Sequence, residues 1–115
     1  MVFGSPGGDA QDQWALQFFL NVTDFGMSLQ EAAEAPTFFT AHFPSSFYPR
    51  RAEPGVVYME SRIPDVVRME LQSRGHIVRV TGPWSSQNVL AVTSGDGVLS
   101  AAASPRLETG YAMGW

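Results

Sequence analysis

The chain contains no cysteine and no lysine, and charged residues make up only 16% of its 115 positions. Without cysteine it can form no disulfide, no thiolate metal site and no cysteine nucleophile. Soluble domains carry roughly 25% charged residues, so this surface has less charge than a free-standing domain normally has. Because 44% of the residues are hydrophobic, the composition also excludes intrinsic disorder.

Basic residues are scarce and of one kind. All seven are arginines, and with eleven acidic residues the formal net charge is −4. This balance argues against electrostatic binding of nucleic acid. The sequence also contains no polybasic stretch that could bind an anionic membrane surface. No apolar run approaches the roughly 20 residues of a membrane helix, and the first residues lack a signal-peptide pattern. We therefore expect no nucleic-acid partner, no membrane association and, by default, a cytoplasmic location.

The length suits one domain and is too short for two, so we expect residues 1–115 to be a single domain or a domain fragment. The spacing of apolar residues predicts a helix over residues 12–25, with Gly26 in a left-handed conformation after it. Ser28 and Glu31 have the spacing of a capping box that opens a second, short helix, which Pro36 ends.

The remaining elements are mainly strands. Ser94-Gly95-Asp96-Gly97 is a strong hairpin signal, and Pro64 is well placed as the first residue of a helix that ends near Gly75. The expected fold class is α+β. The stretches with strand character are residues 1–4, 38–43, 55–60, 77–80, 87–92 and 98–102.

The pair Gly7-Gly8 is the most informative local feature. Consecutive glycines before a helix can turn successive backbone N–H groups toward one point, which suits a phosphate or the oxyanion of an acyl-transfer intermediate. The plainer interpretation is a turn, since unusual φ angles are the commonest use of glycine. The spacing matches neither the P-loop nor the dinucleotide-binding fingerprint.

Other polar candidates favour structural roles. His42 and His76 have no partners at metal-ligand spacing, and His76 follows a predicted helix end, where a cationic ring suits the helix dipole. Asp9 and Asp12 stand at the start of the first helix. They are more simply explained as residues that complement its dipole than as a catalytic carboxylate pair.

Three further segments have competing interpretations. Arg50-Arg51 is better explained as a solvated pair than as an anion site. The aromatic loop over residues 43–49 could line a pocket, although we favour packing in a core or an interface. Trp84-Ser85-Ser86 could hold a serine nucleophile, but no histidine lies nearby in sequence and no elbow-type turn surrounds it.

Two longer motifs carry a family resemblance. Residues 4–13 (GSPGGDAQDQ) and residues 21–36 (NVTDFGMSLQEAAEAP) resemble the GSPGG loop and the D-[FY]-G-M/L…E-A-x-x-A-P segment of the γ-glutamyltransferase (γ-glutamyltranspeptidase) family. Ser104-Pro105-Arg106 and Gly110-Tyr111 resemble its closing D/N-P-R…GY residues. Gln87 falls where family members have a serine/threonine-glutamine pair.

The resemblance implies an N-terminal-nucleophile hydrolase, whose fold is an αββα four-layer sandwich. In such enzymes a self-cleaved precursor exposes a threonine, which attacks the γ-glutamyl carbonyl of a small-molecule donor and passes the acyl group to water or an amine. Carried over to this chain, Gly7 and Gly8 would be the oxyanion donors. We expect no cofactor and no metal.

The family's nucleophilic threonine and the residues that grip the substrate lie upstream of the GSPGG loop. None of the threonines in this chain stands before that loop, so we expect the C-terminal part of the small subunit, catalytically incomplete by itself. Leu16 and Leu20 lie off the main apolar stripe of the first helix. They should be buried against the missing N-terminal part or a second copy. The alternative is a non-enzymatic fold remnant that acts as an assembly or binding module.

Overall fold

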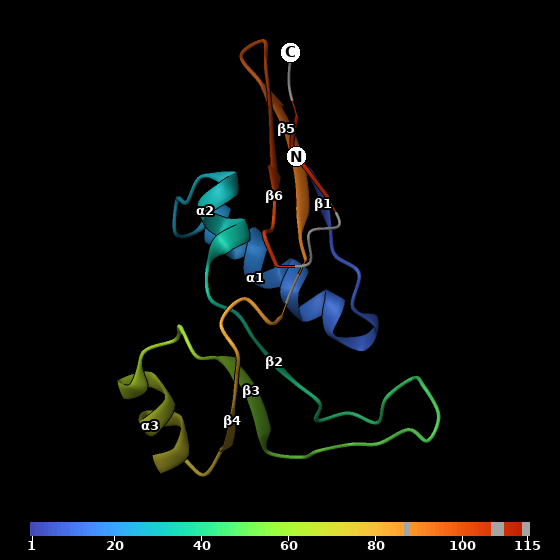
Figure 1. The fold of residues 1–115 in the computed structure, drawn as a ribbon, viewed down its shortest axis with the longest axis vertical. Helices are drawn as coiled ribbons and strands as arrows, with labels where there is room; N and C mark the ends of the chain where they lie inside the picture. The colour runs from blue at the N-terminus through green and yellow to red at the C-terminus, as the bar shows by residue number, and fades with distance from the viewer. Residues whose placement is uncertain (87, 107–109, 114–115) are drawn as a thin grey trace. The chain divides into compact units, whose positions relative to one another are not determined.

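A computed structural model describes residues 1–86, 88–106 and 110–113 of the chain. Helices and strands are mixed, as expected for an α+β protein, and they form two compact units (Figure 1). Unit 1 comprises Met1–Ala35 and Gln87–Trp115, and unit 2 comprises Pro36–Ser86. The prediction that concerns Gln87 lies outside the described residues.

The sheet of unit 1 joins the two ends of the chain. β1 (Val2–Gly4) pairs antiparallel with β5 (Leu90–Gly95), which pairs antiparallel with β6 (Val98–Ala103). Asp96 and Gly97 connect β5 to β6 with φ angles of 51° and 76°. Two successive positive φ angles define the tight turn that matches strand twist, so the predicted hairpin is confirmed.

Two helices of unit 1 follow the sequence signals closely. A 3₁₀ turn, η1 (Gly8–Ala10), leads into α1 (Gln11–Thr23), and Gly26 after it has the expected left-handed φ of 67°. α2 (Leu29–Glu34) opens with the predicted capping box: the Ser28 N–H donates to Glu31 Oε2 at 2.9 Å, and the Glu31 N–H donates to Ser28 Oγ at 3.3 Å. The hydrogen bonds with Ser28 lower the pKa of the Glu31 carboxyl.

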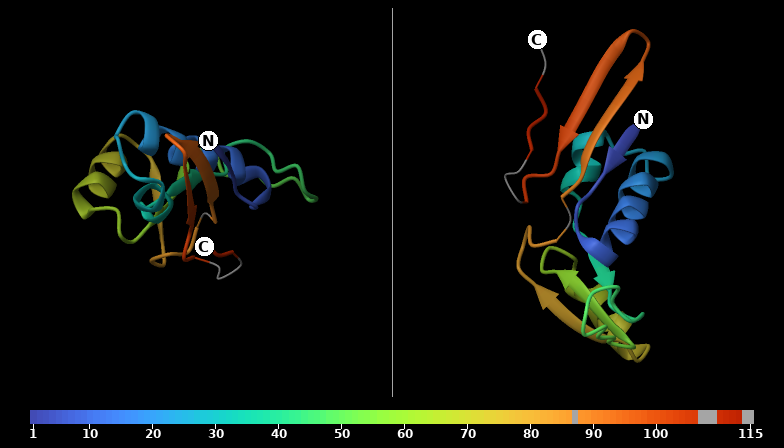
Figure 2. Two further views of the ribbon diagram at one scale, coloured as in Figure 1. Left: turned by 90° about the horizontal axis from the view of Figure 1, so that it is seen from above. Right: turned by 90° about the vertical axis from the view of Figure 1, so that its right-hand side faces the viewer.

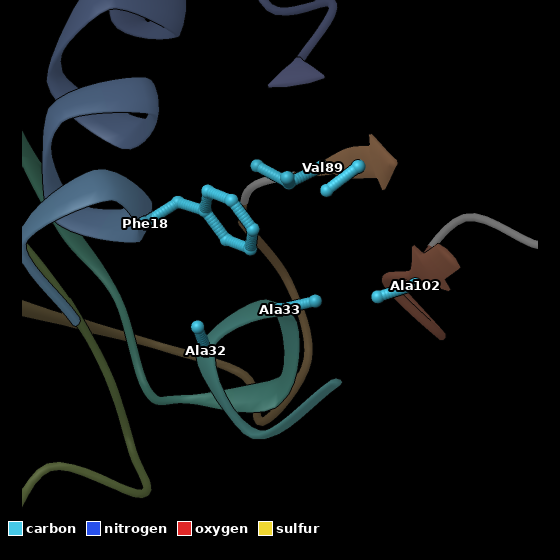
Figure 3. Close-up of a cluster of buried hydrophobic side chains, with 6 residues drawn as sticks. Phe18, Ala32, Ala33, Val89 and Ala102 are labelled. Carbon is cyan, nitrogen blue, oxygen red and sulfur yellow. The ribbon is translucent and has the colours of Figure 1, made fainter. Parts of the chain in front are cut away.

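The core of unit 1 lies between these helices and one face of the sheet. In Figure 3 the ring of Phe18, from α1, points toward Val89 at the start of the hairpin and toward α2. Residues of α1 and α2 share one buried cluster with Ala91 of β5 and Ala102 of β6, so both helices pack on the same face of the sheet, and Figure 2 shows this unit from two further sides. The opposite face presents exposed apolar side chains to solvent, among them Val2, Leu90, Val92 and Leu99.

Unit 2 is a βαβ arrangement with one added strand. β3 (Val56–Glu60) pairs parallel with β4 (Ile77–Thr81), α3 (Asp65–Ser73) connects them, and β2 (Phe38–Thr40) lies antiparallel on the other side of β3. A parallel pair needs such a crossover connection. Pro64 is the N-cap of α3 rather than its first residue. The predicted strand over residues 38–43 ends at Thr40.

Candidate functional site

The Gly7-Gly8 loop runs from the end of β1 to η1. Gly7 has φ 145° and ψ 17°, and Gly8 has φ 56°. Side chains disfavour both backbone conformations, so the glycines are required by the geometry of the turn itself. The Ala10 N–H donates to the Gly7 carbonyl at 3.2 Å and closes the 3₁₀ turn.

The backbone N–H groups of Gly7 and Gly8 are the hydrogen-bond donors that this loop offers to a ligand. Among hydrogen bonds between described residues, neither the Gly7 N–H nor the Gly8 N–H donates to another protein group. Gly7 is exposed and Gly8 is half-buried, so neither residue is enclosed in the core. Two adjacent free N–H groups before a helical turn can stabilise a negatively charged oxygen.

Three contacts hold this loop in place, and sequence reasoning found none of them. The Asn88 N–H donates to Ser5 Oγ at 3.3 Å, and the Ser5 hydroxyl donates to the Pro6 carbonyl at 2.8 Å. The indole ring of Trp14 lies against Gly7, where a Cβ atom would stand 2.9 Å from Cε3, 3.2 Å from Cη2 and closer still to Cζ3. In the sequence, the signal for the contact between Trp14 and Gly7 was the position of Trp14 in the first turn of the helix that follows the loop.

The two histidines have structural surroundings. His42 is exposed, and its Nδ1 accepts a hydrogen bond from the Gly55 N–H at 3.4 Å. His76 is exposed after α3, and its backbone N–H donates to the Leu71 carbonyl. In the described part of the chain, no group of three or more His, Cys, Asp or Glu side chains could hold a metal ion. No helix of that part is long and apolar enough to span a membrane.

The serine candidates are engaged in local structure. Ser85 Oγ bonds to Thr81 Oγ1 at 2.8 Å and to the Gly82 carbonyl at 2.7 Å, and Ser86 is buried. These contacts tie the segment after β4 into a turn. They give Ser85 a structural explanation that needs no catalytic role.

The prediction that the aromatic loop packs in a core is wrong. Phe43, Phe47 and Tyr48 are 83%, 63% and 95% exposed. The loop connects β2 to β3 beyond the end of their pairing, so no layer of unit 2 covers it. A role in an interface stays a prediction. Arg50 and Arg51 in the same loop are also exposed.

Unit 2 contains a buried carboxylate that the sequence did not reveal. Glu60 is fully buried at the end of β3, where Arg62 forms an ion pair with it at 2.7 Å and the Ser86 N–H donates to it at 3.3 Å. The Arg62 guanidinium lies 3.4 Å from the ring centroid of Trp84, which has a left-handed φ of 61°. This cluster fixes the 84–86 segment against β3.

A second ionisable group of unit 2 is shifted by its neighbours. The Tyr58 hydroxyl donates to Glu53 at 2.6 Å, and this hydrogen bond, together with partial burial, raises the pKa of Tyr58. Arg79, which bonds to both groups at 2.7 Å, opposes the shift. The cluster links β3 to β4 on the sheet surface.

The Ser104-Pro105-Arg106 motif also has a structural explanation. Arg106 is only 8% exposed, and its guanidinium donates to the carbonyls of Ala33 and Ala35, each at 2.6 Å. These carbonyls belong to the last turn of α2 and the residue after it, where helices leave acceptors unsatisfied. The closing motif therefore binds the E-A-x-x-A-P motif directly.

Comparison with known proteins gives a family match over nearly the whole chain. The family model described as gamma-glutamyltranspeptidase matches residues 1–114. The chain belongs to the γ-glutamyltranspeptidase family. Its fold class is α+β, part of the αββα sandwich that solved γ-glutamyltranspeptidases and a cephalosporin acylase share.

Two relatives to which this chain is similar are named as different enzymes. An acylase ACY 1 proenzyme of Pseudomonas sp. (strain SE83) is 37% identical over 93% of this chain and 17% of its own length. A glutathione hydrolase proenzyme of Pseudomonas sp. (strain A14) is 30% identical over all of this chain and 20% of its own. The solved structure of LmbA2991HD is 48% identical with a TM-score of 0.92, covering 98% of this chain and 21% of that one. The chain thus spans about a fifth of the length of these relatives.

Proposed function

We propose that this chain is the oxyanion-binding, C-terminal segment of a γ-glutamyltransferase-like acyl transferase or hydrolase. The observation that carries the proposal is the pair of adjacent N–H groups at Gly7 and Gly8, which donate to no other described residue. In this role they bind the oxygen of the acyl carbonyl as it becomes negatively charged.

The reaction requires a nucleophile from the part of the protein upstream of the loop. When its oxygen attacks the γ-glutamyl carbonyl, the C=O π electrons move to the carbonyl oxygen and a tetrahedral intermediate forms. The N–H groups of Gly7 and Gly8 bond this oxyanion more strongly than the neutral carbonyl, and this difference lowers the barrier. Collapse of the intermediate breaks the C–N bond and expels the amine, which takes the proton that the nucleophile's hydroxyl lost, and leaves an acyl-enzyme for water or an acceptor amine.

The proposed donor is a γ-glutamyl amide of the glutathione type, and the proposed partner is the N-terminal part of the same protein. The name of the glutathione hydrolase relative supports this donor, whereas the other relative is named only as an acylase. The oxyanion site serves both, because it contacts the carbonyl common to all such donors.

Replacement of Gly8 by alanine in the full-length protein is expected to lower kcat by about 10²–10³, the usual effect of losing an oxyanion donor. The methyl group disfavours the positive φ at this position, so the N–H turns away from the oxyanion. KM should change much less, since the interaction is made mainly in the transition state. Steady-state kinetics with a γ-glutamyl anilide measures both constants. An increase in KM alone would reassign the loop to ground-state substrate binding.

The 115-residue chain by itself is expected to give no γ-glutamyl transfer, because no threonine precedes its oxyanion loop. Donors to an oxyanion cannot replace an activated nucleophile. Purified chain incubated with the same anilide should release aniline no faster than buffer does. Turnover that co-purifies with the chain and disappears in its Gly8→Ala variant would contradict this prediction.

A further inference from the structure

The contact between Trp14 and Gly7 suggests a role beyond the glycines themselves. The six-membered ring of the indole occupies the space in which any other residue at position 7 would place its Cβ atom. Gly7 also has φ 145°, which side chains disfavour in any case. The close approach of the ring is therefore a second, independent reason for glycine at this position.

Trp14 is half-buried and stands on the helix that contributes Phe18 to the core of unit 1. It stands four residues before Phe18 on α1, so both side chains project from the same face of the helix. Phe18 is fully buried, and its ring centroid lies 5.2 Å from that of Phe3 in β1. β1 leads directly into the glycine loop, so aromatic contacts fix both the strand before the loop and the helix after it.

A loop of adjacent glycines has many alternative backbone conformations, and only a narrow set points both N–H groups at one oxygen. Catalysis by hydrogen-bond donors depends on their being oriented before the charge develops. A rigid ring packed on Gly7 removes conformations in which the peptide plane rotates toward the helix.

We propose that Trp14 is a positioning residue for the oxyanion donors of Gly7 and Gly8. Its ring lies against Gly7, so in this role it acts through the orientation of the two N–H groups. This inference rests on the oxyanion function proposed above.

The test uses the full-length protein and compares Trp14→Ala and Trp14→Phe with Phe25→Ala. Phe25 follows the same helix but is 72% exposed, so its replacement is a matched aromatic deletion away from the loop. With a γ-glutamyl anilide, we expect Trp14→Ala to lower kcat about 10- to 10²-fold, the scale of an ångström-size misplacement. KM should stay within about threefold by the same reasoning, because ground-state binding is little affected. Trp14→Phe, which keeps a ring, should restore part of kcat, and Phe25→Ala should leave kcat unchanged.

Gly8→Ala separates this inference from the function on which it rests. A large loss of kcat in Gly8→Ala, with wild-type kcat in both Trp14 variants, would overturn the positioning role alone. Wild-type kcat in Gly8→Ala would overturn the oxyanion function, and this inference with it. A change confined to KM in the Trp14 variants would show that the ring serves substrate binding. If Trp14→Ala does not fold, an intermediate kcat for Trp14→Phe supports the role and a wild-type kcat contradicts it.

Discussion

Replacing Arg106 with alanine is expected to destabilise unit 1 by several kcal/mol. The guanidinium is buried, and it donates to the Ala33 and Ala35 carbonyls at 2.6 Å and to Ser104 Oγ at 3.1 Å. Hydrogen bonds to a charged group contribute about 1.5–3 kcal/mol each. Loss of the two short ones amounts to roughly 3–6 kcal/mol, against a total stability of about 5–15 kcal/mol for a typical domain.

The location of these acceptors adds to the effect. The carbonyls at the end of α2 carry the negative end of the helix dipole, and the residue that follows them is Pro36, so the helix cannot continue and satisfy them. Removal of the guanidinium leaves a cavity lined with unpaired carbonyls. The substitution also frees residues 104–106 from α2. The remaining contact between α2 and the sheet is then the one made by β6.

Urea denaturation followed by circular dichroism measures this loss, with Arg74→Ala as the control. Arg74 forms an ion pair with Glu70 on the surface of α3, and both side chains are more than half exposed. Such pairs contribute about 0–1 kcal/mol. Arg106→Lys keeps the charge but not the planar fork, so it should fall between the two. Equal stability of Arg106→Ala and Arg74→Ala would contradict the proposed role of Arg106 in linking the two motifs.

Local elements of this fold could be predicted from the sequence because their signals are local. The capping box of Ser28 and Glu31 determines where α2 starts, and Asp96-Gly97 determines the hairpin turn, each within four residues. The family resemblance supplied the layer architecture and pointed to Gly7 and Gly8. Their availability as donors could be seen only in the structure.

Contacts between distant segments could not be predicted. β1 pairs with β5 nearly the length of the chain away, and neither strand carries a residue that specifies the other. Arginine is normally exposed, so nothing marked Arg106 as buried. Aromatic residues are normally buried, and for the same statistical reason the loop over residues 43–49 was predicted to pack in a core or an interface. Its exposure contradicts the core and leaves the interface a prediction.

The isolated 115-residue chain is expected to self-associate, because one face of the unit 1 sheet leaves several apolar side chains exposed among the described residues. Val2 and Leu99 on that face are 77% and 78% exposed, and Val92 between them is half exposed. On α1, Leu16 is 56% exposed, as expected from its position off the main stripe, whereas Leu20 is half-buried. Each large apolar side chain left in water forgoes roughly 1.5–3 kcal/mol. In an αββα sandwich a second sheet would cover this face; for the chain alone, the available cover is a second copy.

Sedimentation velocity at micromolar concentration tests this expectation against the 12.5 kDa of the monomer. Val92→Lys and Leu16→Lys place a charge on the sheet face and on the helix, and Val66→Lys on the exposed surface of α3 in unit 2 is the control. If the sheet face mediates association, Val92→Lys should shift the chain toward monomer and Val66→Lys should not. A shift with Leu16→Lys instead would place the contact on α1. The expectation is contradicted if the wild-type chain is a compact monomer that unfolds cooperatively and binds no apolar dye. Unit 1 would then be stable with its sheet face in water, without a second copy or an upstream segment to cover it.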